Sequence, residues 1–159
     1  MIEAQLHIEE LTINTRRTGE GPGTILFVHG NSCSSDFWDP QLNDRDLQKD
    51  FSMIAIDLPG HGSSSRSPDY SLKFLSDTLV LIIQKLSLDS YILSGLSYGT
   101  ALIAETAPKL KNCKGFFLAS PNITSDAFPP ASYIIPFPEL LTMVSAAVET
   151  DILKRFASH

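Results

Sequence analysis

The sequence predicts an α/β fold with a mostly parallel sheet and helices on both faces of that sheet. Short apolar runs alternate with helical segments along the chain, which is the pattern of βαβ units. Several of these runs are continuously apolar, as in strands that are buried on both faces. The chain has 159 residues, of which 43% are hydrophobic and 19% are charged, the composition of an ordinary globular domain.

Six runs are expected to form strands: Gln5–Ile8, Leu11–Thr15, Thr24–Val28, Ser52–Ile56, Tyr91–Leu93 and Gly115–Ala119. The glycine- and proline-rich stretch 19–23 predicts a turn before the third of them.

Three helical segments are expected between these strands. A polar helical stretch follows from Asp36. Leucines and isoleucines at three- and four-residue spacings predict an amphipathic helix that Ser71 caps and that ends near Leu86. A third helix is predicted over Tyr98–Ala107, because Pro108 cannot continue it.

The composition of the sequence changes after Ser120. The segment from Pro121 to Pro138 is rich in proline and aromatic residues, and Glu139 to Ser158 has a helical pattern. We therefore expect residues 1–120 to form the N-terminal part of the core and 121–159 to begin a cap.

Charge and composition exclude several classes of partner. The net charge is −6, with lysine and arginine scattered, so neither nucleic acid nor an anionic membrane is expected. No secretory signal is visible and no apolar run is long enough to span a bilayer, which predicts a soluble, cytoplasmic protein. Cys33 and Cys113 are interpreted as free thiols, with a single disulfide as the alternative.

The motif GLSYG places Ser97 between two glycines, directly after an apolar strand and before a helix. A nucleophile elbow needs such a sharp turn, and glycines two residues away remove side chains that would clash there. Ser97 is therefore the candidate nucleophile. The alternative is a glycine-rich turn without chemistry.

The motif HGNS follows the strand Thr24–Val28. Attack on an acyl carbon builds negative charge on the carbonyl oxygen, which preorganised N–H donors stabilise. We expect the backbone N–H groups of Tyr98 and Asn31 to be those donors, because they follow the nucleophile and the third strand. The alternative is a purely structural role, in which Gly30 and Asn31 only turn the chain at the end of the strand.

The three motifs HGNSCSSDFW, DLPGHGSS and GLSYGT, in this order, resemble the N-terminal half of an α/β-hydrolase-fold enzyme. The resemblance extends from Leu6 to Ala119 and implies that the chain supplies the first six strands of that sheet. More narrowly, HGNSCSSDFWDPQL followed by IAIDLPGHGSS is similar to the N-acyl-homoserine lactonases of this superfamily. That similarity implies cleavage of an ester or lactone through an acyl-enzyme.

The resemblance also implies a catalytic acid and a histidine that come after the serine. His7, His29 and His61 precede Ser97, and we interpret them as structural. His159 is the final residue, in the expected cap. We therefore expect the acid and the histidine to lie outside this chain, in a C-terminal part that is present as a separate polypeptide. A truncated chain is the rival explanation, and this chain alone is expected to be inactive.

The residues expected to contact substrate come from the HG loop, the segment after it and the cap: Gly30, Asn31, Phe37, Trp38, Tyr133 and Phe137. For the aromatic residues, core packing is an equally open alternative. A serine nucleophile disfavours the dehalogenase and epoxide hydrolase reactions, which use aspartate. No metal-ligand spacing, phosphate loop or dinucleotide motif is found, so no metal and no cofactor are expected.

The preferred hypothesis for function is ring opening of N-acyl-homoserine lactones, that is, quorum quenching. The alternatives are a general carboxylesterase or other acyl hydrolase, and a non-catalytic ligand receptor with a hydrolase fold.

Overall fold

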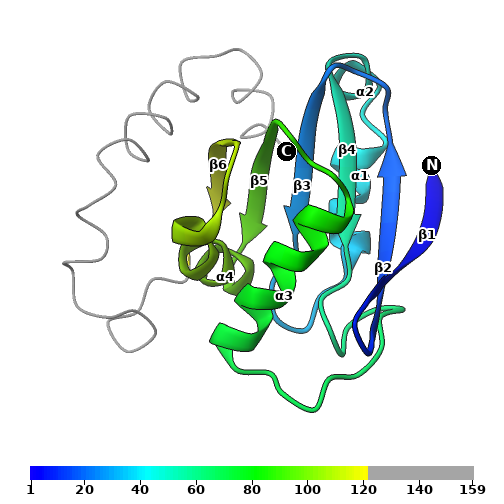
Figure 1. The fold of residues 1–159 in the computed structure, drawn as a ribbon. Helices are drawn as coiled ribbons and strands as arrows, with labels where there is room; N and C mark the ends of the chain where they lie inside the picture. The colour runs from blue at the N-terminus through cyan, green and yellow to red at the C-terminus, as the bar shows by residue number, and fades with distance from the viewer. Residues whose placement is uncertain (122–159) are drawn as a thin grey trace.

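The computed structural model describes residues 1–121, and these form one sheet of six strands in the order β1-β2-β4-β3-β5-β6 (Figure 1). The strands are β1 (Ile2–Ile8), β2 (Leu11–Thr18), β3 (Gly23–Val28), β4 (Phe51–Ile56), β5 (Tyr91–Leu96) and β6 (Cys113–Ala119). The order places β4 between β2 and β3, so the chain passes over β3 before it continues outward to β5 and β6.

The sheet is mostly parallel, as the sequence predicts. β3 pairs in parallel with both β4 and β5, and β5 pairs in parallel with β6. The first two strands form an antiparallel hairpin, and β2 also runs antiparallel to β4. All six predicted strands are present.

The helices lie on both faces of the sheet. Two longer helices, α3 (Leu72–Lys85) and α4 (Tyr98–Thr106), cover one face, and the short α1 (Asp39–Leu42) and α2 (Arg45–Asp50) lie on the other (Figure 1). Two 3₁₀ turns, η1 (Ser35–Trp38) and η2 (Ala107–Lys109), complete the elements.

Two helix starts show how local chemistry sets these boundaries. The Ser71 side chain accepts a hydrogen bond from the N–H of Phe74, which confirms its predicted role as N-cap of α3. The single helical stretch predicted after Asp36 is instead divided into η1, α1 and α2. It is divided because the Asp44 carboxylate accepts from two following N–H groups and so begins a new helix.

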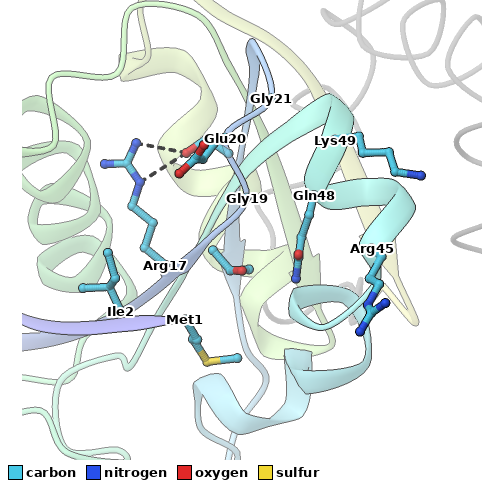
Figure 2. A pocket seen from close by; sticks show the side chains of 11 residues that line it. Met1, Ile2, Arg17, Gly19, Glu20, Gly21, Arg45, Gln48 and Lys49 are labelled. Atoms are coloured by element: carbon cyan, nitrogen blue, oxygen red, sulfur yellow. Dashed lines mark hydrogen bonds between the residues drawn. The ribbon is translucent and has the colours of Figure 1, made fainter.

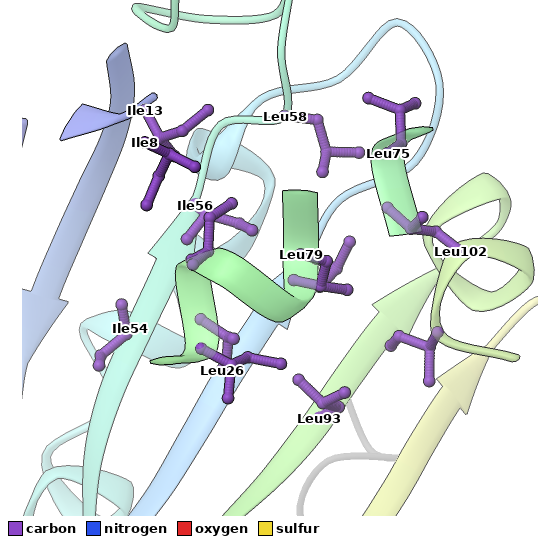
Figure 3. Packing of buried hydrophobic residues seen from close by; sticks show 14 of the residues in the cluster. Ile8, Ile13, Leu26, Ile54, Ile56, Leu58, Leu75, Leu79, Leu93 and Leu102 are labelled. Atoms are coloured by element: carbon purple, nitrogen blue, oxygen red, sulfur yellow. The ribbon is translucent and has the colours of Figure 1, made fainter. Parts of the chain in front are cut away.

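Alternate residues of the central strands point into two separate cores. On β3, Leu26 and Val28 face α3 and α4, whereas Ile25 and Phe27 face α1 and α2. Figure 3 shows the first core, where leucines of α3 and α4 pack over the apolar residues of β3, β4 and β5. This two-sided burial explains why the strands read as continuous apolar runs.

The C-terminal ends of the parallel strands lie on one side of the sheet, and this side positions the site. β3 ends at Val28, β4 at Ile56 and β5 at Leu96. The loops that begin with His29, Asp57 and Ser97 therefore leave the sheet side by side, which is where α/β folds place their ligands.

Two further expectations can be compared with the structure. Cys33 and Cys113 are both free thiols, as predicted. The predicted cap, 121–159, lies outside the described residues except for Pro121. Among residues 1–121, no helix has both the length and the apolar composition needed to cross a bilayer.

Candidate active site

Ser97 occupies a strained turn between β5 and α4. Its φ is +48° and its ψ is −115°, a backbone conformation that residues with a Cβ rarely adopt. Such a conformation costs about 1–3 kcal/mol and persists only where the surroundings enforce it. Here the N–H of Ser97 donates to the carbonyl of Ala119 at 3.0 Å. The hydroxyl of Thr100 donates to the carbonyl of Ser97 at 2.6 Å.

The glycines on either side of Ser97 allow three segments of backbone to meet. A Cβ on Gly95 would lie 2.6 Å from Cδ1 of Ile103 and 3.0 Å from the backbone of Gly99. A Cβ on Gly99 would lie 2.5 Å from the carbonyl oxygen of Val28, at the end of β3. The 2.5 Å contact is with backbone and is shorter than real Cβ contacts, so Gly99 is required by close packing of the elbow, and a side chain at position 95 would require Ile103 to move.

The HG loop and the serine motif come together at this edge. A Cβ on Gly30 would lie 3.3 Å from Cβ of Ser97 and 3.2 Å from the carbonyl oxygen of Leu96. Asn31, the next residue, is exposed to solvent. Two motifs that are far apart in the sequence therefore lie side by side.

Tyr98 is the first residue of α4, and it is half-buried. The N–H groups of a first helical turn have no acceptor within the helix, and they carry the positive end of the helix dipole. The N–H of Tyr98 is therefore suited to stabilise negative charge that develops beside Ser97.

His29, the histidine of the HG motif, is completely buried. Its Nδ1 lies 2.6 Å from the carbonyl oxygen of Gly30, and its Nε2 lies 3.0 Å from the backbone nitrogen of Leu58, which donates to it. Because Nε2 accepts, the ring is neutral and Nδ1 carries the hydrogen. Burial lowers the pKa of His29 below 6.5, and the nearby His61 adds to that effect.

Asp57 ties the loops together. Its carboxylate accepts from the N–H of Ser35 at 2.6 Å, from the N–H of Ser63 at 2.9 Å and from the amide of Asn14 at 3.1 Å. Burial raises the pKa of this carboxyl, but the hydrogen bonds outweigh burial and hold the pKa below 3.8. Asp57 is thus an ionised anchor, a role that no sequence motif indicated.

The other two histidines within residues 1–121 are His7 and His61. His7 is exposed on the edge strand β1, and His61 packs against His29 with ring centroids 5.0 Å apart. Within residues 1–121, no histidine or carboxylate makes a hydrogen bond to the Ser97 hydroxyl. His159 and the acids of the predicted cap lie outside the described residues.

The aromatic residues expected to contact substrate differ in exposure. Phe37 is 47% exposed, whereas Trp38 is only 2% exposed and packs on Phe27 with ring centroids 4.7 Å apart. Trp38 therefore lies in the core, which is one of the two alternatives that the sequence left open. Tyr133 and Phe137 lie outside the described residues.

A large surface depression lies at the opposite edge of the sheet. It has a volume of about 930 Å³ and lies between the end of β2, α2 and the start of β4. Its cations do not converge, since Figure 2 shows Arg17 and Lys49 pointing in opposite directions. Arg17 donates to Ser52 and Lys49 pairs with Asp46. Ligands of α/β folds bind at the C-terminal ends of the parallel strands, where Ser97 lies. We therefore take Ser97, and not this depression, as the candidate site.

Comparison with known proteins identifies the family of the chain. A family model described as the alpha/beta hydrolase fold matches residues 23–158. Within residues 1–121, no group of three or more histidine, cysteine or acidic side chains is arranged to hold a metal ion.

Solved structures that are similar to this chain include two of the lactonase AidH. The N-acyl homoserine lactonase AidH with N-butanoyl homoserine has a TM-score of 0.71 and 28% identity, covering 76% of this chain and 45% of that one. A serine-to-glycine variant of AidH, solved with N-hexanoyl homoserine lactone, has a TM-score of 0.69 and 28% identity, covering 74% and 45%.

Curated relatives include a hydrolase and a methyl ester esterase. The 2-(acetamidomethylene)succinate hydrolase of Mesorhizobium japonicum is 32% identical over 68% of this chain and 38% of its own length. The pimeloyl-[acyl-carrier protein] methyl ester esterase of Pseudoalteromonas atlantica is 32% identical over 59% and 34%. The chain thus spans well under half the length of either.

Proposed function

This chain belongs to the α/β-hydrolase fold family, and we propose that it is the nucleophile-bearing part of a serine hydrolase that cleaves carboxylic esters or lactones. The observation that carries the proposal is the strained Ser97 elbow, which lies against Gly30 at the carboxyl edge of the parallel strands. Strain of this kind gathers at functional sites because it holds a reactive group in place.

The reaction follows from the groups at this edge. The Ser97 oxygen attacks the carbonyl carbon of the substrate, while a base accepts the hydroxyl proton. The oxygen of the tetrahedral intermediate accepts hydrogen bonds from the N–H groups of Tyr98 and Asn31. The carbon–oxygen bond to the alcohol then breaks, and the alcohol takes up the proton. Water hydrolyses the acyl-enzyme and releases the acid.

The base and its orienting acid are proposed to come from a more C-terminal part of the same enzyme, outside residues 1–121. Two observations support this. Among the described strands, β6 is the last of the sheet and pairs with β5 alone, so a strand of that part would be added beside β6. The chain also spans only 45% of the similar lactonase structure.

For the substrate, we propose the ring of an N-acyl-homoserine lactone. Support comes from the lactonase AidH, whose serine-to-glycine variant was solved with an intact lactone. In this chain Phe37 is 47% exposed, and Trp38 packs edge-on against it with ring centroids 5.3 Å apart. We propose that Phe37 forms part of an apolar wall for the acyl chain, and that Asn31 contacts the lactone end.

The test uses the purified protein in the assembly that it forms. N-hexanoyl homoserine lactone is incubated with wild type and with Ser97→Ala, and the product is followed by mass spectrometry. The proposal predicts the gain of one water by the lactone with wild type alone. Turnover of p-nitrophenyl butyrate without ring opening would favour a general carboxylesterase. Saturable binding of the lactone with no turnover of either compound would favour a ligand receptor.

A further inference from the structure

The imidazole of His29 holds the peptide group that joins Gly30 to Asn31. The Nδ1–H donates to the carbonyl oxygen of Gly30 at 2.6 Å, across a single residue of the chain. The mechanism proposed above uses only the N–H at the other end of this peptide group. It does not yet explain why a histidine lies behind it.

The geometry of the peptide unit supplies the connection. In a trans peptide the C=O and the following N–H lie in one plane and point in opposite directions. No cis peptide occurs among the described residues. Because the carbonyl of Gly30 points inward to the buried ring, the N–H of Asn31 points outward, away from His29. Gly30 itself lies beside Ser97, so this N–H is presented at the edge where the nucleophile lies.

The ring is itself fixed from behind. Its Nε2 accepts from the N–H of Leu58 at 3.0 Å, and Leu58 is 2% exposed. The preceding residue, Asp57, is anchored by Ser35 and Ser63. The loop after β4 therefore holds the ring, and the ring holds the peptide, with the two nitrogens used as one acceptor and one donor.

We propose that His29 is a positioning residue that aims the N–H of Asn31 at the substrate oxyanion by fixing the carbonyl of Gly30. This inference rests on the proposed hydrolase function, since it assigns a role within that reaction. This role requires a side chain that offers one hydrogen-bond donor and one acceptor, and side chains of similar size differ in whether they do. Glutamine carries a donor and an acceptor, whereas phenylalanine fills the space with neither.

The kinetic test compares three variants of the assembly that shows esterase or lactonase activity. His29→Phe is expected to lower kcat about 100-fold, the effect of losing one oxyanion donor. KM should change less than about 3-fold, because the interaction is made only in the transition state. His29→Gln is expected to recover at least 10-fold of that loss. His7→Phe, on the exposed edge strand, serves as the control with wild-type kinetics.

Active-site titration with a fluorophosphonate separates positioning from misfolding. A structural role for His29 would reduce the fraction of active sites and leave the turnover of each remaining site unchanged. That result would overturn the proposal, as would an unaltered kcat in His29→Phe. An inert wild type, by contrast, would refute the hydrolase function itself.

A second readout does not depend on activity. In ¹⁵N-labelled wild type, the hydrogen bond predicts a measurable ¹⁵N–¹⁵N coupling between Nε2 of His29 and the amide of Leu58. In a crystal structure of His29→Phe, the peptide 30–31 is expected to rotate or to occupy two orientations. Absence of the coupling in wild type, or an unchanged peptide in the variant, would contradict the proposal.

Discussion

Gly99 and Val28 are in such close contact that no side chain fits between them. The Cβ atom of an alanine at position 99 would lie 2.5 Å from the carbonyl oxygen of Val28. One residue belongs to the first turn of α4 and the other ends β3, so this contact sets how far the helix start can approach the sheet. The position of Ser97 depends on that approach.

The sign of the stability change in Gly99→Ala tests this contact. Helix propensity alone favours alanine over glycine by about 1 kcal/mol. Because the clash is with backbone, which cannot rotate away, we expect the variant instead to lose about 1–3 kcal/mol of unfolding free energy. Urea denaturation measures the difference. Ala104→Gly in the same helix serves as the control for propensity, and a Gly99→Ala protein as stable as wild type would refute the contact.

Gly30→Ala is expected to separate reactivity from folding. The added Cβ would lie 3.3 Å from Cβ of Ser97 and 3.2 Å from the carbonyl oxygen of Leu96. These contacts are tight but tolerable, so the melting temperature should stay close to that of wild type. The methyl group crowds the space in front of Ser97, and we expect fluorophosphonate labelling to slow about tenfold, equivalent to about 1.4 kcal/mol. Labelling at the wild-type rate would place the reacting atoms elsewhere.

Asp57→Asn should destabilise the protein far more than the same change at an exposed site. An amide in place of the carboxylate leaves at least one buried N–H donor unsatisfied, at a cost of about 1–3 kcal/mol. Asp36→Asn is the matched control, because that side chain is 75% exposed in its pair with Arg16, where ion pairs contribute about 0–1 kcal/mol.

The pH dependence of this effect has a definite sign. Hydrogen bonding holds the pKa of Asp57 below 3.8 in the folded state, so its stabilisation is present above that pH. The difference between wild type and Asp57→Asn should shrink as the pH falls through this range. A difference that stays constant with pH would contradict an ionised anchor.

His29 predicts a second pH dependence, at higher pH. Burial lowers its pKa in the folded state below 6.5; His61 also lowers it, while the Gly30 carbonyl and Asp57 act in the opposite direction. Below pH 6.5 the unfolded chain therefore takes up a proton that the folded chain does not. The free energy of unfolding consequently decreases as the pH is lowered. Urea midpoints measured from pH 7.5 to 5 should fall more steeply for wild type than for His29→Phe. Parallel curves would show that His29 is not buried in its neutral form.

The sequence predicts the strands and longer helices well, because burial on both faces leaves apolar runs that can be read directly. The ends of the strands are harder to predict. β5 continues through Ser94 and Gly95 to Leu96, and small residues carry no strand signal even though both are buried. The insertion of β4 between β2 and β3 is a long-range pairing that no local pattern encodes.

The motifs of the candidate site can be found in the sequence, but the hydrogen bonds that hold its loops in place cannot. Ser97 and Gly30 stand out because turns and close approaches require glycine at fixed spacings. The bond between Asn14 and Asp57 joins residues 43 positions apart, and nothing in either neighbourhood indicates it. Trp38 shows a further limit, since the sequence cannot tell an aromatic residue of the core from one that faces a cleft.

Covalent labelling of Ser97 tests the central claim most directly. The purified assembly is treated with a fluorophosphonate, its chains are weighed under denaturing conditions, and the modified peptide is sequenced. The account predicts one label on the peptide that contains Ser97 and none in Ser97→Ala. A folded protein that resists the reagent, or a label on any other serine, would contradict it.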